Sequence, residues 1–149
     1  MRDRVAAILL LAWAAGAVAV VGAQESQTFK SRLSPVPISA DMVTRITGSG
    51  SATGVLTGTT LTLTGLFTGL QSAATTAHVH IGERMGVRGP AVFDVRVDAA
   101  TTGSLSATIA LNALQITALK RGLFYVQIQS EKAPEGNLWG WLLVPEVKR

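Results

Sequence analysis

Polar and apolar residues alternate in short segments along most of the chain. In residues 60–64 threonine and leucine alternate, which is the period of a β-strand with one buried face. The same pattern predicts strands near residues 43–47, 51–56, 60–64, 77–81, 91–97, 104–111, 123–129 and 138–144. Since no long helical pattern separates these strands, we expect an all-β fold: an antiparallel, Greek-key-like sandwich or barrel of about eight strands.

Two segments depart from this alternation. Residues 113–121 contain good helix formers, Asn112 can cap the first turn, and Gly122 can end the last one, so one short helix is predicted here. Residues 24–31 are polar, and we expect them to fray. Residues 34–37 contain two prolines, which favour an extended or turned entry into the fold.

The N-terminus has the pattern of a secretory signal peptide. Arg2 and Arg4 precede an unbroken apolar run over residues 5–21, and small residues follow immediately before Gln24. This order predicts a cleaved signal peptide, residues 1–23, and therefore a secreted or periplasmic protein. The apolar run is roughly 17 residues long, at the lower edge of what spans a bilayer, so an uncleaved membrane anchor stays open as the alternative.

The remainder of the chain has the length of one ordinary domain. We expect residues 24–45 to form an N-terminal extension and entry strand, residues 46–145 to form one β domain, and residues 146–149 to form a C-terminal tail. After cleavage of the leader, no membrane span is expected.

Charge, cysteine content and the absence of catalytic motifs limit the classes of function that are expected. The net charge is +4, but the basic residues are spread along the chain without interleaved aromatic residues, so a nucleic-acid partner is not indicated. The chain has no cysteine, so the fold must be held by its hydrophobic core, which this length permits. Neither a Gly-x-Ser-x-Gly nucleophile motif nor a phosphate-binding glycine loop is present, and we therefore expect no enzyme and no catalytic residues.

Both histidines of the chain lie in the run Ala77–Ile81, at positions 78 and 80. Side chains two apart on a strand point to the same face, so His78 and His80 are expected to lie side by side. With a third donor such as Asp94, Glu83 or Glu131, the pair could bind copper or zinc.

The alternative is a structural polar patch. In that interpretation the histidines hydrogen-bond to the backbone or to Gln127 and Gln129 on a neighbouring strand, and the protein has no cofactor.

Trp139 and Trp141 form a second candidate site. On a strand they share one face, and an exposed aromatic pair of this kind suits a protein or carbohydrate partner. The alternative is that both tryptophans are packed inside the fold, against Phe124 or Tyr125.

Four blocks of sequence, in order, carry a family resemblance. They are residues 50–56 with 61–63; residues 65–70 with the strand that ends in His78-Val79-His80; the loop and strand at residues 86–94, with Gly89-Pro90-Ala91-Val92; and residues 119–142. Together the blocks resemble the chordin-type (CHRD) domain, which occurs in microbial secreted proteins and in chordin, over residues 46–144. The resemblance implies a non-catalytic binding or structural module of the cell envelope or exterior, with a protein or envelope partner whose identity it does not give.

The chain departs from the pattern of this family at two places. Where the family usually has Asn-Val-His-Thr, this chain has Gln127-Ile128-Gln129-Ser130, so Gln129 replaces a third histidine. Where the family usually has Arg-Gly-Gln, this chain has Trp139-Gly140-Trp141. The amide oxygen of glutamine is a poor ligand for transition metals, so the first departure weakens the metal hypothesis.

Overall fold

The structure, a computed structural model, describes residues 22 and 24–146. The predicted leader, apart from Gly22, lies outside these residues. Eight strands are present: β1 (Ser26–Leu33), β2 (Ser49–Thr57), β3 (Thr60–Thr68), β4 (Ala74–Ile81), β5 (Ala91–Val97), β6 (Gly103–Ala110), β7 (Phe124–Ser130) and β8 (Ala133–Trp141). A short 3-10 helix, η1 (Ala40–Thr44), and one α-helix, α1 (Ala113–Lys120), complete the described part. The all-β prediction with one short helix is confirmed.

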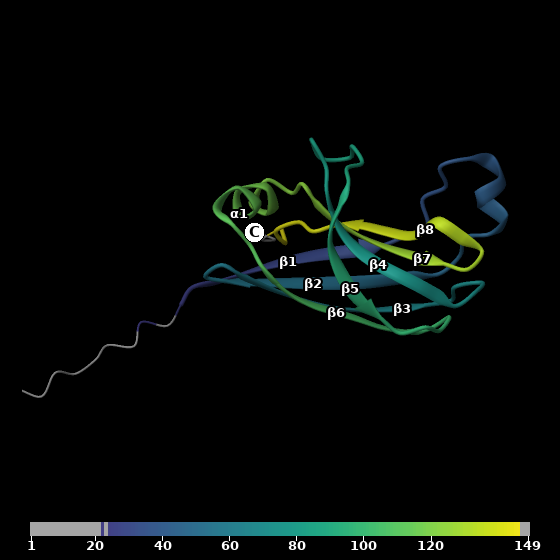
Figure 1. The fold of residues 1–149 in the computed structure, drawn as a ribbon, viewed down its shortest axis with the longest axis horizontal. Helices are drawn as coiled ribbons and strands as arrows, with labels where there is room; N and C mark the ends of the chain where they lie inside the picture. Colours follow the sequence, from purple (N-terminus) through teal and green to yellow (C-terminus); the bar gives the residue numbers. More distant parts are fainter. Residues whose placement is uncertain (1–21, 23, 147–149) are drawn as a thin grey trace, which may run out of the picture.

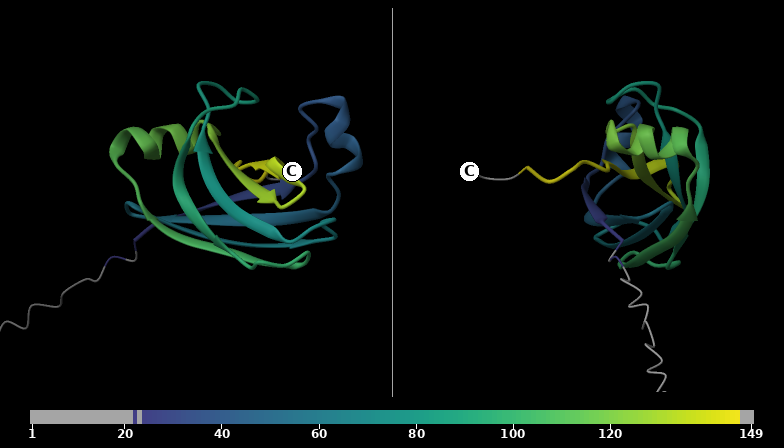
Figure 2. Two further views of the ribbon diagram at one scale, coloured as in Figure 1. Left: turned by 45° about the vertical axis from the view of Figure 1, so that its right-hand side comes forward. Right: turned by 90° about the vertical axis from the view of Figure 1, so that its left-hand side faces the viewer.

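All eight strands belong to one antiparallel sheet, in the order β1-β2-β3-β6-β5-β4-β7-β8. Strands β4, β5 and β6 lie side by side, and β7 returns through α1 to pair with β4, which is a Greek-key connection. The sheet is curled into a half-barrel, with α1 at one end and η1 at the other (Figures 1 and 2). Its two edge strands, β1 and β8, meet at bridges between Lys30 and Leu143 and between Ser34 and Trp139.

The inner face of the curled sheet holds the hydrophobic core. Leu61 and Leu63 of β3, Val79 of β4 and Val126 of β7 are all fully buried in it. Most strands expose their other face, as in β3, where the outward threonines lie in solvent. Strand β7 is different, because six of its seven residues are buried and the remaining one, Gln129, is partly buried. Other segments of the chain must therefore cover the outer face of the sheet around β7.

The two N-terminal predictions were wrong. Residues 24–31 do not fray, because β1 turns Phe29 and Leu33 into the core and leaves the intervening Lys30 and Arg32 outside. The strand expected at residues 43–47 is replaced by η1 and the turn that follows it. Its buried residues are Met42 and Ile46, which are four apart, and this spacing suits a helical turn better than a strand.

The predicted helix is confirmed and its caps explain its ends. The Asn112 side chain accepts a hydrogen bond from the Gln115 backbone N–H, and the Gln115 side chain accepts one from the Asn112 N–H. Gly122, with φ of +72°, adopts the left-handed conformation just after the helix, where glycine is preferred.

We predict that Gly140→Ala destabilises the fold where β8 closes against β1. A Cβ at position 140 would lie 2.1 Å from the Ser31 hydroxyl and 2.4 Å from the Arg32 carbonyl oxygen. The unfolding free energy measured by urea denaturation should fall by about 1–3 kcal/mol, as for other overpacked sites. Adding Ser31→Ala should recover only part of this loss, because the contact with the Arg32 carbonyl remains. An unchanged denaturation midpoint in Gly140→Ala would contradict this account of the closure.

Candidate functional site

The outer face of β4, β7 and β8 brings both candidate sites together. Between β4 and β7, the register pairs His78 with Gln127 and His80 with Tyr125. Between β7 and β8, it pairs Gln127 with Trp139 and Tyr125 with Trp141. All of these side chains point away from the hydrophobic core, because Val79, Val126 and Leu138 alternate with them and point into it. We call the set of His78, His80, Tyr125, Gln127, Trp139 and Trp141 the aromatic–histidine face.

Two segments cover this face. The first is the flap, residues 82–90, which joins β4 to β5 and projects from the sheet between α1 and η1 (Figure 1). The second is the strap, residues 34–39, which leads from β1 to η1. Beneath them Trp139 is only 9 % exposed, although it does not belong to the core cluster inside the half-barrel. Both tryptophans are therefore packed against Tyr125, as one interpretation expected, but they lie in a second aromatic layer on the outer face of the sheet and not in the core.

The backbone N–H and carbonyl oxygen of Gly89 fasten the flap to the aromatic–histidine face. Its carbonyl oxygen accepts hydrogen bonds from His80 Nδ1 at 3.0 Å and from the Tyr125 hydroxyl at 3.0 Å, and its N–H donates to that hydroxyl at 3.1 Å. A Cβ at position 89 would lie 1.9 Å from the Ile81 carbonyl oxygen, so only glycine can approach β4 this closely.

These contacts define the tautomer and the protonation state of the His80 imidazole. Since a carbonyl oxygen only accepts, Nδ1 carries the proton and donates it, and Nε2 is left without a hydrogen-bond partner in the described part of the chain. Burial lowers the pKa of His80 below its ordinary value of 6.5, while the hydrogen bond to Gly89 opposes this and the nearby His78 and Arg88 add to it. The imidazole is therefore held in its neutral form.

Stacked rings form the floor of the covered face. The Tyr125 ring is stacked on the His80 ring at a centroid distance of 4.7 Å and on the Trp139 ring at 5.7 Å. The Trp141 ring is tilted against Tyr125 at 4.7 Å. From the flap, the Arg88 guanidinium carbon lies 4.4 Å from the centre of the Trp139 ring, a cation–π contact.

A cleft of about 160 Å³ remains between the flap, the strap and this floor. It is lined by Val36, Ile38, Gly86, Arg88, Tyr125, Trp139 and Trp141. The indole N–H of Trp139 is buried and has no hydrogen-bond acceptor among the described residues. The cleft therefore combines apolar and aromatic walls with one cation, the Arg88 guanidinium.

The predicted metal ligands are only partly brought together. The rings of His78 and His80 lie edge to face, with centroids 6.1 Å apart, and His78 Nε2 lies 3.6 Å from Asp94 Oδ1. The Asp94 side chain is 99 % exposed, and Glu131 lies in the turn after β7, beyond the Thr76–Gln129 pair and away from His80. Within residues 22 and 24–146 there is no group of three or more His, Cys, Asp or Glu side chains able to hold a metal ion.

The two glutamines do not bind the histidines. The Gln127 amide donates to the Glu135 carbonyl oxygen at 2.6 Å, and the Gln129 amide oxygen accepts from the Thr76 hydroxyl at 3.1 Å. The hydrogen-bonded patch that the sequence suggested is therefore built from the backbone of the flap and from Tyr125.

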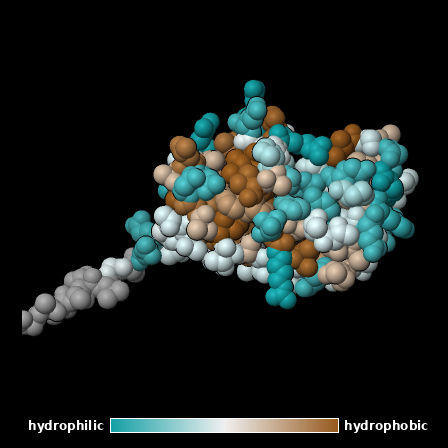
Figure 3. All heavy atoms as spheres, viewed as in Figure 1, coloured by the Kyte–Doolittle hydropathy of each residue, from teal (hydrophilic) through white to brown (hydrophobic). Residues whose placement is uncertain are grey.

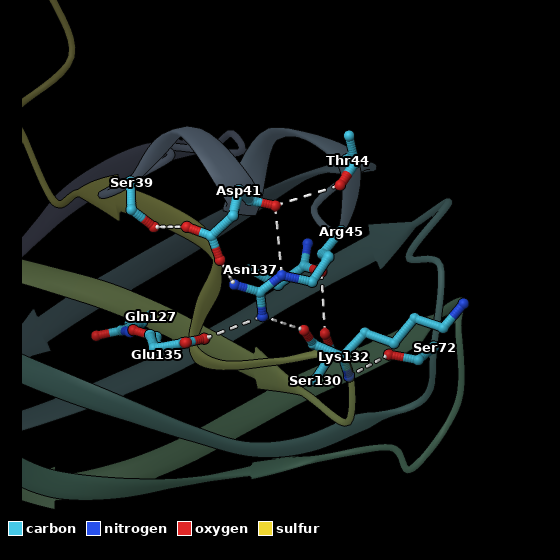
Figure 4. A network of polar contacts seen from close by, with 10 residues as sticks. All are labelled: Ser39, Asp41, Thr44, Arg45, Ser72, Gln127, Ser130, Lys132, Glu135 and Asn137. Carbon is cyan, nitrogen blue, oxygen red and sulfur yellow. Dashed lines mark hydrogen bonds and ion pairs between the residues drawn. The ribbon is translucent and has the colours of Figure 1, made fainter.

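A second polar network fixes the far end of the strap (Figure 4). Arg45, just after η1, pairs with Asp41 at 2.6 Å and donates to the Lys132 carbonyl oxygen at 2.8 Å in the turn between β7 and β8. The fully buried Asn137 donates to the Thr47 carbonyl oxygen at 2.8 Å. The strap is thus held between its bridge to β8 at Ser34 and this network.

Sequence reasoning missed Arg88, Gly89 and the strap as parts of the site. The signal available was the glycine-rich loop that follows the histidine strand, with an arginine and Gly-Pro close together. The pattern of polar and apolar residues at 34–39 does not indicate that this segment lies over Trp139 and Trp141. Its position depends on the bridge between the end of β1 and β8.

The architecture defines the chain as a small β-module with a preformed, covered recess on one sheet face. The CHRD domain model matches residues 29–142, and the chain belongs to the CHRD family. The match starts inside β1, earlier than the resemblance over residues 46–144 suggested. CHRD domains are non-enzymatic, binding-type domains. No curated protein and no solved structure matches the chain.

We predict that His80 makes the fold less stable in mild acid. The unfolded imidazole takes up a proton near pH 6.5, whereas the folded one does so only at lower pH, so the unfolded state binds more protons below pH 6.5. The free energy of unfolding should therefore be constant above that pH and decline as the pH falls through the lowered pKa.

Urea denaturation at about pH 7.5 and about pH 5 checks this. The decline should shrink in His80→Gln and persist in the matched variant His78→Gln. An equal decline in the wild type and in His80→Gln would contradict the assignment to His80.

Proposed function

We propose that this chain is a non-catalytic binding module that works outside the cytoplasm, in the cell envelope or exterior, and holds a protein partner on its aromatic–histidine face. The observation that carries the proposal is the cleft over Trp139 and Tyr125, with its aromatic floor and the Arg88 cation. Aromatic and arginine side chains of this kind are enriched where protein surfaces bind partners.

Export is the second part of the proposal. The charged start, apolar run and small residues before Gln24 favour a cleaved leader. Cleavage after Ala23 leaves the whole of β1, which begins at Ser26, in the mature protein. Among the described residues, none of the helices is long and apolar enough to cross a membrane.

One experiment tests both parts. The full chain, with a tag after Arg149, is produced in its source cell and treated with a crosslinker, and the product is recovered from each compartment. We expect it in the envelope or exterior fraction, starting at Gln24 by mass spectrometry and crosslinked to a partner.

Trp141→Ala should lose most of that crosslink, because the ring forms part of the cleft. Leu66→Ala, a change of an apolar side chain that is 66 % exposed on β3, should keep it. Retention of residues 1–23, or equal crosslinking by the Trp141 variant, would contradict the corresponding part of the proposal.

A copper or zinc site at His78 and His80 is the alternative function. It is favoured by two buried imidazole nitrogens, His78 Nδ1 and His80 Nε2, that have no hydrogen-bond partner among the described residues. Among the described residues, the exposed Asp94 carboxylate is the one further acidic donor near the pair, so a tight site would need additional ligands.

Calorimetric titration with copper and with zinc tests this alternative. The wild type should bind about one ion, and the double variant His78→Ala, His80→Ala should bind at least about ten-fold more weakly if the histidines are ligands. Identical isotherms for the two proteins would exclude the histidine site.

A further inference from the structure

We infer that the cleft binds an acidic peptide segment of the partner, with one aromatic or branched apolar side chain seated between the strap and the flap and a neighbouring carboxylate on Arg88. The inference rests on the proposed function and names the chemistry of its partner. It is carried by the size of the cleft, by the two flap arginines that form no ion pair among the described residues, and by the exposed apolar residues of the strap.

The cleft has room for one large apolar side chain. Its volume of about 160 Å³ is close to that of a protein cavity that binds benzene, roughly 150 Å³. Tyr125 and Trp139 offer ring faces on one side, and Val36 and Ile38 of the strap offer aliphatic groups on the other. An aromatic ring or a leucine-sized group would therefore contact apolar atoms on both sides.

The charges beside the cleft select a carboxylate. Within the described residues, neither Arg84 nor Arg88 of the flap forms an ion pair with a carboxylate, and Glu83 on the same flap lies beyond pairing distance of both. The Arg88 guanidinium lies over the Trp139 ring, which orients it and leaves its N–H groups for a ligand.

The strap makes one side of the cleft apolar. Val36 and Ile38 of the strap line the cleft and are about half exposed. The flap also exposes Met85, which lies with Leu143 against Gly122 at the end of α1, and Figure 3 shows hydrophobic residues gathered below the flap and beside α1. Exposed apolar groups around a recess are typical of a surface that a partner covers.

The larger groove elsewhere on the sheet lacks this combination. It has a volume of about 640 Å³ and lies over Phe67 at the ends of β2, β3 and β6. Its only carboxylate, Asp98, already accepts hydrogen bonds from the Ser104 N–H and hydroxyl at 2.8 Å, and Thr68 and Thr102 bond to one another. No free charge remains there to select a ligand, so the cleft beneath the flap is the stronger site.

Three blocked pentapeptides test the inference on the full chain: Asp-Glu-Phe-Glu-Asp, its uncharged counterpart Asn-Gln-Phe-Gln-Asn, and Asp-Glu-Ala-Glu-Asp, which lacks the apolar anchor. Binding is followed by NMR through the Trp139 indole N–H and the backbone N–H of Gly86 and Gly89. The first peptide should shift these signals and bind about ten-fold more tightly than either of the others, a difference of about 1.4 kcal/mol. Equal binding of all three peptides would overturn the inference.

Charge variants separate the role of Arg88 from a general effect of charge. Arg88→Gln should reduce binding of the acidic peptide to the level of the uncharged one, and Arg88→Lys should restore part of it. The matched variant Arg96→Gln, on the exposed side of β5, should bind as the wild type does. Unchanged binding in Arg88→Gln, or an equal loss in Arg96→Gln, would overturn the assignment.

A membrane surface is the other occupant that basic and apolar groups could suit. Vesicles of phosphatidylserine and phosphatidylcholine are therefore included, and binding to them without binding of the acidic peptide would overturn the inference. If Trp141-dependent crosslinking to a partner is found and the peptides do not bind, only the peptide chemistry is wrong. If the crosslink is absent as well, the proposed function fails with it.

Discussion

The site depends on three hydrogen bonds that join the backbone N–H and carbonyl oxygen of Gly89 to His80 and Tyr125. They turn a loop between two strands into a fixed cover for the outer face of the sheet. With the cover in place, polar and aromatic residues that would face solvent on an ordinary antiparallel sheet become buried. The burial of Tyr125, the neutral state of His80 and the position of Arg88 over Trp139 all follow from this one attachment.

The curled sheet makes this attachment possible. Because β1 and β8 meet at Ser34 and Trp139, the chain leaving β1 must cross the tryptophans before it reaches η1. Gly140 permits that meeting, since any side chain there would strike β1. The half-barrel thus has a dry aliphatic core on its inside and a smaller, mixed aromatic layer on its outside. A binding module needs such a division, because the core provides stability while the outer layer provides recognition.

Much of this arrangement could be predicted from local patterns. The alternation of β2, β3 and β6 and the caps of α1 are encoded within a few residues, and they were predicted correctly. The shared face of His78 and His80 follows from strand geometry alone. The predictions of fraying at residues 24–31 and of a strand at residues 43–47 failed because the apolar residues of β1 and η1 are few, and only contacts with distant residues decide which of them are buried. Glu131 and Asp94 could not be judged as ligands without the register that sets their distance from the histidines.

By itself, the sequence determined the fold class and the sides of the strands, because strand periodicity and turn chemistry act between near neighbours. The resemblance of its four blocks to the CHRD domain also indicated the family, which the family model shows. Only the tertiary structure decided whether the outer face is open or covered. The same two tryptophans on the same strand face would be an exposed platform without the flap and the strap, and both segments reach them through contacts with remote parts of the chain. Whether a side chain is buried depends on which distant segments pack against it in the folded chain. No local pattern could therefore predict that Trp139 and His80 are buried.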